Sequence, residues 1–328
     1  MRLESVRALK EEASTKIVMP MLADGHRVMA FAAGPIARLE RKPRTFALGI
    51  APAGDKQFRL AIRTQRHELS DGPEIARLIR MAKGEVDLRF IGRVQKRAAS
   101  LQSAIRPLVI GCSVAHMKVT AGTLGGFVKK RRGGGIHMLS NNHVLANENA
   151  CAIGDAILQP GPLDGGKLRS KVAVLSGFVA LKAGRPNHVD SAIAEVGAAM
   201  ESDPRRLRQI GQLRGVRSEE IDAGLRVAKI GRTTGITRGR VTAFEVDDVV
   251  VAYTLGNVSF NDQIEIEGVG STLFSDGGDS GSLIVDLGGF AVAQLFAGSE
   301  QGGRNNKGLT YATPIQTVLD SLRVDLLY

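Results

Sequence analysis

Residues 275–285 read Ser-Asp-Gly-Gly-Asp-Ser-Gly-Ser-Leu-Ile-Val, and this segment decides how the rest of the chain is interpreted. Ser280 stands in a glycine-rich turn directly before an apolar strand, where its hydroxyl is sterically open. Glycines let backbone N–H groups approach a carbonyl oxygen closely and point the same way, as an oxyanion hole requires. Gly278 and Ser280 are placed to supply two such groups. A polar hairpin turn would read the same, so the surroundings must decide.

Two further segments carry candidate catalytic side chains. Residues 139–146 (LSNNHVLA) place His143 at the end of an apolar strand, and residues 188–196 (HVDSAIAEV) place Asp190 directly before an alternating one. Taken without the other segments, His143 would be interpreted as a structural residue, and Asp190 would be interpreted as a residue of a turn or of a strand start. Together the three segments follow the order His, Asp, Ser inside a mostly β region, which is the order of the chymotrypsin-type triad.

On these residues the chain resembles the trypsin- and chymotrypsin-like serine peptidases over roughly residues 108–322. Residues 120–128 (TAGTLGGFV), residues 229–241 (KIGRTTGITRGRV) and the pair GGDSGSLIV and AVAQLFAG resemble, more narrowly, the plant narrow-leaf-type trypsin-like proteins and their bacterial relatives. The resemblance implies a chymotrypsin-like double β-barrel, with the site in the cleft between two perpendicular six-stranded barrels. It implies an endopeptidase that works through an acyl-enzyme.

The resemblance also assigns roles to residues. Ser280 would be the nucleophile, His143 the base and Asp190 the residue that orients the base, while the N–H groups of Gly278 and Ser280 would form the oxyanion hole. The alternative is a catalytically silent protein of the same fold that acts as a protein-interaction module. An intact set of triad residues favours the enzyme.

The substrate pocket follows from the same analogy. Its base would lie at Phe274, with Ser275 beside it and Gly298 on a wall. Because no acidic residue stands at that base, we expect a small or apolar side chain before the cleaved bond, not Lys or Arg.

The sequence around Arg106 bears on whether the chain is activated by cleavage of its N-terminal region. In many digestive relatives the aspartate before the nucleophile, here Asp279, pairs with an N-terminus freed by cleavage. The candidate junction has Pro107 after Arg106, which blocks ordinary tryptic cleavage and leaves no primary amine. We therefore expect the N-terminal region to be retained.

Residues 1–100 predict a small α+β accessory domain, regulatory or for assembly. Residues 1–20 predict an amphipathic helix, residues 46–52 and 57–65 a hairpin, residues 70–84 a helix, and residues 86–94 a strand. Residues 101–328 predict the peptidase domain, because short strand-like runs separated by glycine-rich turns continue to a closing helix at 313–322.

Composition bounds the class of protein. Hydrophobic residues make up 43% of the 328 residues, and no apolar run approaches a membrane span. Only Cys112 and Cys151 occur, and the first 20 residues lack a secretory pattern, so we expect reduced thiols in a cytoplasmic protein. The net charge of +11 could attract nucleic acid, but an aromatic content of 4% offers few stacking platforms, so we do not expect nucleic acid as a partner.

The remaining motifs predict no cofactor and no metal. Residues 161–168 (GPLDGGKL) lack the Ser or Thr of a phosphate-binding loop, and neither cysteine has zinc-site spacing. The expected partners are a protein or peptide substrate and a regulatory partner through the N-terminal domain. Homo-oligomerisation stays open, and no membrane is expected.

Overall fold

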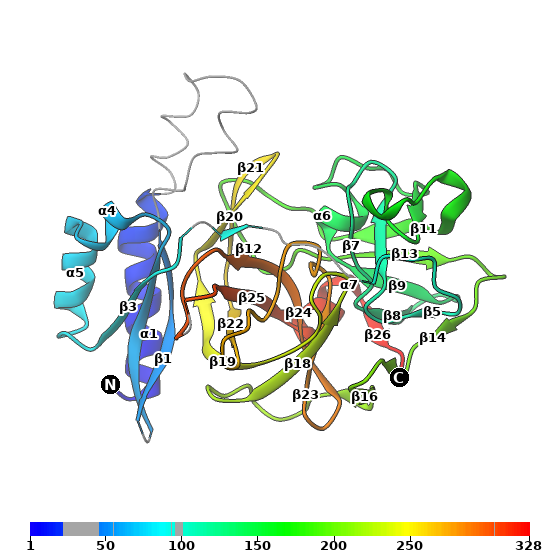
Figure 1. Ribbon diagram of the computed structural model, residues 1–328. Coiled ribbons are helices and arrows are strands. Elements are labelled where there is room, and N and C mark those ends of the chain that lie inside the picture. Colours follow the sequence, from blue (N-terminus) through cyan, green and yellow to red (C-terminus); the bar gives the residue numbers. More distant parts are fainter. Residues whose placement is uncertain (22–45, 55, 93, 96–100, 305) are drawn as a thin grey trace.

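Residues 226–314 contain a closed six-stranded barrel, which we describe from a computed structural model covering residues 1–21, 46–54, 56–92, 94–95, 101–304 and 306–328 (Figure 1). Its strands pair in the order β18-β23-β24-β25-β22-β19, and β19 pairs back to β18. The strands are β18 (Arg226–Gly231), β19 (Gly235–Asp247), β22 (Gln263–Gly268), β23 (Leu283–Asp286), β24 (Phe290–Ser299) and β25 (Leu309–Pro314).

A second, curled sheet precedes the barrel in sequence. Its order is β26-β8-β9-β13-β11-β10-β6-β7, so the last strand of the chain completes a sheet that begins near residue 113. The helix α7 (Ile315–Leu322), expected from the sequence, carries the chain there. The strands are β6 (Ser113–His116), β7 (Gly122–Thr123), β8 (Gly126–Lys130), β9 (His137–Ser140), β10 (Ala156–Leu158), β11 (Lys171–Phe178), β13 (Ala192–Val196) and β26 (Val324–Leu326).

The N-terminal region forms the α+β unit that the sequence predicts. Helix α1 (Leu3–Ala13) continues as a π turn over Ser14–Val18, and helix α5 (Pro73–Met81) follows the short α4 (His67–Ser70). Both long helices bury apolar side chains against β1 (Phe46–Gly54) and β2 (Gln57–Thr64), and β3 (Val86–Phe90) pairs parallel to β2. The mostly β double barrel preceded by a small α+β unit is therefore confirmed.

One predicted strand is wrong in its extent. Residues 86–94 were expected as one strand, but β3 ends at Phe90 and a separate strand, β4 (Val94–Gln95), pairs with β24 instead. Gly92 lies between them with φ +65°, a left-handed conformation that glycine adopts without strain. The chain turns there from the N-terminal unit onto the barrel. Residues 96–100 lie outside the described residues.

The N-terminal unit extends the barrel sheet directly. β1 pairs with β19, so strands β1, β2 and β3 continue the sheet beyond the barrel (Figure 1). Smaller strands complete the chain, among them β17 (Gly215–Val216), β20 (Val249–Tyr253) and β21 (Gly256–Phe260). In the part of the chain that the structure describes, no helix is long and apolar enough to cross a membrane.

Candidate active site

His143 and Asp190 come from neighbouring elements of the curled sheet. His143 lies in the short helix α6 (Asn142–Leu145), directly after β9, and Asp190 lies just before β13, which pairs with β9. The His143 Nδ1 atom hydrogen-bonds Asp190 Oδ2, and the His143 backbone N–H donates to Oδ1 at 3.1 Å. Two contacts therefore fix the histidine to one carboxylate.

Two residues that the sequence did not single out hold Asp190. The hydroxyl of Tyr253, on β20, donates to Asp190 Oδ2 at 2.6 Å, and Asn141 Nδ2 donates to the Asp190 carbonyl at 2.6 Å. Burial alone would raise the pKa of the Asp190 carboxyl, but the contacts with His143 and Tyr253 outweigh it and lower that pKa. Asp190 is thus held as a buried carboxylate.

The Ser280 turn joins the barrel to the curled sheet. Thr123 on β7 donates its N–H to the Ser280 carbonyl at 2.8 Å, and its hydroxyl donates to the Gly278 carbonyl at 2.6 Å. The next residue, Gly281, has φ +95°, and a Cβ there would lie 2.2 Å from Ser140 Oγ. Since Ser140 ends β9 three residues before His143, the turn lies beside the strand that leads to the histidine.

Polar groups at this turn and at His143 have no partner among the described residues. The Ser280 hydroxyl and His143 Nε2 are buried, and neither makes a hydrogen bond. The backbone N–H groups of Gly278 and Ser280 have no acceptor. Buried polar groups in folded proteins are nearly always satisfied, so such a group of exceptions indicates a site that completes its hydrogen bonds with a ligand.

Asp279 is held by the segment that the sequence singled out without a role, residues 229–241. Lys229 Nζ lies 2.9 Å from Asp279 Oδ2, and the N–H groups of Thr233 and Thr234 donate to Oδ1 at 2.8 and 3.2 Å. The side chains of Lys229 and Asp279 are fully buried. Burial lowers the pKa of the Lys229 amine, and Asp279 opposes that effect. Asp279 is thus paired with a buried lysine of the barrel strand β18.

The predicted pocket residues all lie in the closed barrel. Phe274 is 1% exposed and packs in the barrel core. The Ser275 hydroxyl lies 2.6 Å from that of Thr310, and Gly298 on β24 pairs with Gln95 of β4. The role of these three residues in a substrate pocket stays a prediction.

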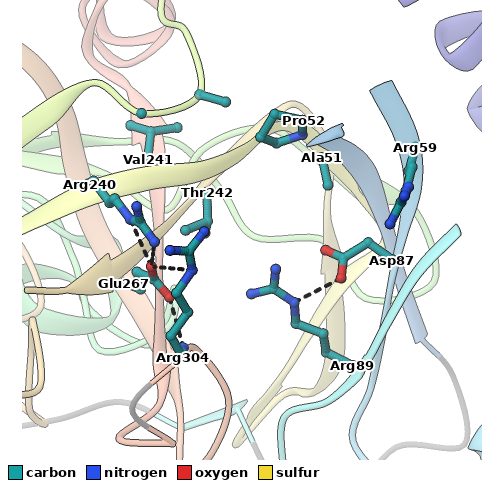
Figure 2. A pocket seen from close by; sticks show the side chains of 12 residues that line it. Ala51, Pro52, Arg59, Asp87, Arg89, Arg240, Val241, Thr242, Glu267 and Arg304 are labelled. Atoms are coloured by element: carbon teal, nitrogen blue, oxygen red, sulfur yellow. Dashed lines mark hydrogen bonds and ion pairs between the residues drawn. The ribbon is translucent and has the colours of Figure 1, made fainter. Parts of the chain in front are cut away.

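A polar hollow of about 260 Å³ lies away from these residues, between the N-terminal unit and the barrel (Figure 2). Arginine side chains reach it from both sides. Arg89 pairs with Asp87 at 3.0 Å, while Arg240 and Arg304 approach Glu267. The hollow shares no residue with the candidate site, and its two carboxylates are already paired.

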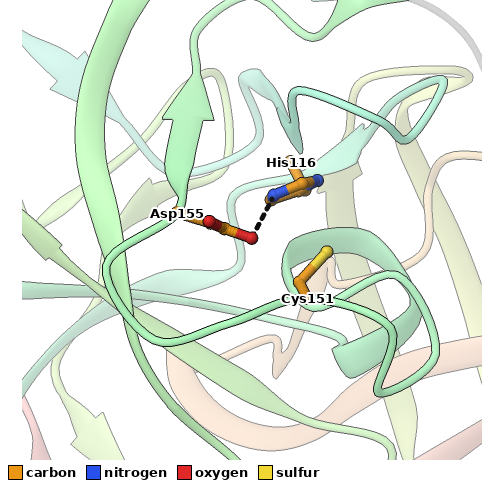
Figure 3. Close-up of side chains that lie close together, drawn as sticks. All are labelled: His116, Cys151 and Asp155. Carbon is orange, nitrogen blue, oxygen red and sulfur yellow. Dashed lines mark hydrogen bonds and ion pairs between the residues drawn. The ribbon is translucent and has the colours of Figure 1, made fainter.

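A cluster of His116, Cys151 and Asp155 lies at the outer end of the curled sheet (Figure 3), with possible ligand atoms within 4.8 Å of one another. The Lys118 N–H donates to His116 Nδ1 at 3.1 Å, so the neutral ring carries its proton on Nε2, which faces Asp155 Oδ2 at 3.2 Å. Burial raises the pKa of the Cys151 thiol. Metal binding needs a free imidazole lone pair and a thiolate, and these contacts oppose both.

The glycine-rich loop at residues 161–168 contributes an ion pair. Pro162–Asp164 forms a single 3₁₀ turn, and Asp164 accepts hydrogen bonds from the buried guanidinium of Arg232 and from Ser113 at 2.6 Å. Arg232 also donates its backbone N–H to Thr123 Oγ1 at 3.0 Å. The loop therefore helps to hold the barrel against β7, next to the Ser280 turn.

Comparison with known proteins gives matches among solved structures alone. No family model and no curated protein matches this chain. Among solved structures, Thermobifida fusca Protease A is 18% identical with a TM-score of 0.47, covering 67% of this chain and 98% of its own. Cellulomonas bogoriensis chymotrypsin is 17% identical, with a TM-score of 0.45 and coverages of 67% and 98%. A glutamic acid-specific serine protease is 20% identical, with a TM-score of 0.49 and coverages of 67% and 100%.

Proposed function

We propose that this chain is a serine endopeptidase in which Ser280 is the nucleophile, His143 the general base and Asp190 the residue that orients the base. One observation carries the proposal: a histidine is bound through Nδ1 to a buried carboxylate, and its Nε2 is buried without a partner among the described residues. The Ser280 hydroxyl is unpaired in the same way, in a turn that packs against the end of β9. A histidine held in this way presents a proton acceptor at Nε2.

The reaction would proceed by acyl transfer. His143 Nε2 takes the proton of Ser280 as the Oγ atom attacks a peptide carbonyl, and Asp190 stabilises the imidazolium that forms. The unpaired N–H groups of Gly278 and Ser280 then receive the carbonyl oxygen as it becomes an oxyanion. The imidazolium returns its proton to the leaving amine, and water hydrolyses the acyl-enzyme by the same steps.

The finer parts of the proposal come from the sequence. We propose a protein or peptide substrate, with a small or apolar residue before the cleaved bond and Phe274, Ser275 and Gly298 at the pocket. The nearer likeness to plant narrow-leaf-type proteins, the cytoplasmic location and assembly into oligomers belong to this level as well. They rest on the motifs and the composition.

The test is covalent labelling with a small fluorophosphonate, measured by intact mass. We expect one adduct on the wild type and none on Ser280→Ala. The matched control is Ser282→Ala, because Ser282 lies two residues along in the same turn and its hydroxyl is also buried without a partner among the described residues. That variant should label like the wild type. A folded wild type that does not label would instead favour a binding module without turnover.

A further inference from the structure

The candidate nucleophile is bound to one particular strand of the barrel. The Gly281 N–H donates to the Leu295 carbonyl on β24 at 2.8 Å, and the Leu295 N–H donates to the Ser282 carbonyl at 3.0 Å. On one side β24 pairs with β25 as far as Gly298, whereas on the other side β23 pairs only as far as Gln294. Beyond the turn, β24 therefore has an edge that the barrel leaves open.

The chain's own residues occupy that edge. β4 pairs antiparallel with β24, with Gln95 opposite Gly298 and Val94 opposite Ser299. The Gln301 N–H donates to the Ile91 carbonyl at 3.0 Å, which extends the contact by one more hydrogen bond. A strand rises about 3.4 Å per residue, so β4 begins roughly 10 Å along β24 from the point where the Ser280 turn is attached.

An open strand edge is a template for an extended peptide. Its unpaired N–H and C=O groups bind a main chain of any sequence, and neighbouring pockets supply the selectivity. A peptide whose carbonyl reaches Ser280 continues past the turn in extended form, and the edge of β24 beyond Leu295 is the nearest strand that can pair with it. β4 holds the same groups that this peptide would use.

We propose that β4 is an autoinhibitory strand, which must leave the edge of β24 before a peptide substrate can bind there. This inference rests on the proposed peptidase function and assigns its regulation to β4 and to the Ile91 carbonyl. Release would come from an event that pulls on the N-terminal unit, such as the binding of a protein partner to it.

Attachment of the N-terminal unit does not explain β4. The unit is already joined to the barrel by the β1–β19 ladder and by the buried pair between Arg63 Nε and Glu265 Oε2 at 2.6 Å. Ser14 adds a hydrogen bond to Asp248 at 2.6 Å. A strand of two residues adds little to these contacts, and a strand this short is readily displaced by a longer one.

The experiment compares two double variants of the full-length chain. Val94→Pro with Gln95→Pro removes the two N–H groups with which β4 can pair, whereas Val94→Ala with Gln95→Ala changes the same side chains and keeps both groups. Each variant and the wild type are treated with two reagents. One is a small fluorophosphonate, which needs no strand contact, and the other is a tetrapeptidyl phosphonate, which must pair as a strand.

We expect all three proteins to react equally with the small reagent. The proline variant should react about tenfold faster than the alanine variant and the wild type with the peptidyl reagent, because it lacks main-chain hydrogen bonds that compete with the reagent. Equal peptidyl rates in three folded proteins that all react with the small reagent would overturn autoinhibition and leave the peptidase function standing. Failure of the small reagent in all of them would overturn both.

A second measurement needs no variant. Hydrogen exchange of the backbone amides of Val94, Gln95 and Gln301 is followed in the wild type before and after reaction with each reagent. We expect exchange at these amides to become faster only after the peptidyl reagent has bound, because β4 must then have left β24. Unchanged protection of these amides in fully labelled protein would overturn the proposal even if the proline variant does not fold.

Discussion

Tyr253 shows how a single side chain can matter at this site without being visible in a motif. Its position in residues 249–255 (VVVAYTL) is that of any inward-facing residue on an alternating strand. In the structure its hydroxyl is buried against Asp190, and burial raises the pKa of that hydroxyl well above its usual value. It stays protonated and can only donate to the carboxylate.

If the chain is the proposed peptidase, replacing Tyr253 by Phe should slow peptide hydrolysis about tenfold, because a hydrogen bond to a charged group contributes about 1.5–3 kcal/mol. Without this donor the pKa of Asp190 rises, so the acid limb of the kcat/KM profile should move to higher pH. Tyr253 is a positioning residue, and a purely structural role would change the yield or the Tm without moving that limb. The measurement is kcat/KM from pH 4 to pH 9 for both proteins.

The buried pair of Lys229 and Asp279 gives a second prediction at this scale. Lys229→Met leaves the Asp279 carboxylate buried without its cation, which should cost about 3–5 kcal/mol of unfolding free energy. The double variant Lys229→Met with Asp279→Asn should recover part of the loss. Denaturant titrations of the four members of the cycle check this. A coupling energy near zero would show that the two side chains act independently.

At the residue scale, the sequence predicted the candidate catalytic residues but not the side chains that hold them. His143, Asp190 and Ser280 carry distinctive short motifs. The structure brings the first two into contact and packs the turn of the third against Ser140, at the end of β9. The side chains that hold them, such as Tyr253 and Lys229, come from segments far away in sequence. Only the fold brings those partners together, so no local pattern could have assigned them.

At the scale of elements, the alternation of apolar and polar residues predicted where strands occur. It did not predict which strands pair with each other. The split of residues 86–94 into β3 and β4 depends on a left-handed Gly92, and the pairing of β4 with β24 joins segments about two hundred residues apart. The pairing of β26 with β8 in the curled sheet could not be predicted from the local sequence either. An alternating pattern shows which face of a strand is buried, but it does not show which strand lies beside it.

The junction of α1 with the barrel predicts a dependence on pH. Asp248, between β19 and β20, is buried against Ser14, and burial raises its pKa to about 6. Its pKa is about 3.9 in the unfolded chain, so between those values the folded state binds more protons. The free energy of unfolding contributed by Asp248 is therefore fully present below about pH 4 and falls as the pH rises through 6.

Asp248→Asn should remove that loss. Asparagine keeps an acceptor for the Ser14 hydroxyl and tolerates the φ of +58° at this position. Its stability relative to the wild type should therefore increase by up to about 3 kcal/mol between pH 4 and pH 7. Urea titrations at pH 4, 5, 6 and 7 measure the difference. A difference that stays constant with pH would show that Asp248 does not titrate in this range.

At the scale of the whole molecule, the sequence predicts a domain boundary at residue 100. In the structure, one continuous sheet joins the strands on the two sides of that boundary. β1 continues the barrel through β19, and Arg63 on β2 reaches Glu265 on β22, with both side chains fully buried. The composition of residues 1–100 suits a separate domain, but these contacts cross the proposed boundary, so we expect its stability to depend on the barrel.

Calorimetry tests this dependence. We expect the wild type to unfold in one transition and Arg63→Met to unfold in one transition at lower temperature, because the substitution leaves Glu265 buried without its cation, at a cost of about 3–5 kcal/mol. At roughly 2–4 °C per kcal/mol, the shift should be about 6–20 °C. Arg59→Met, on the same strand but exposed and without an ion pair among the described residues, should leave Tm unchanged.

Two transitions in the wild type, with only the lower one moved by Arg63→Met, would instead make residues 1–100 an autonomous domain. An inhibitory strand would then sit on a unit that can unfold and release it while the barrels stay folded.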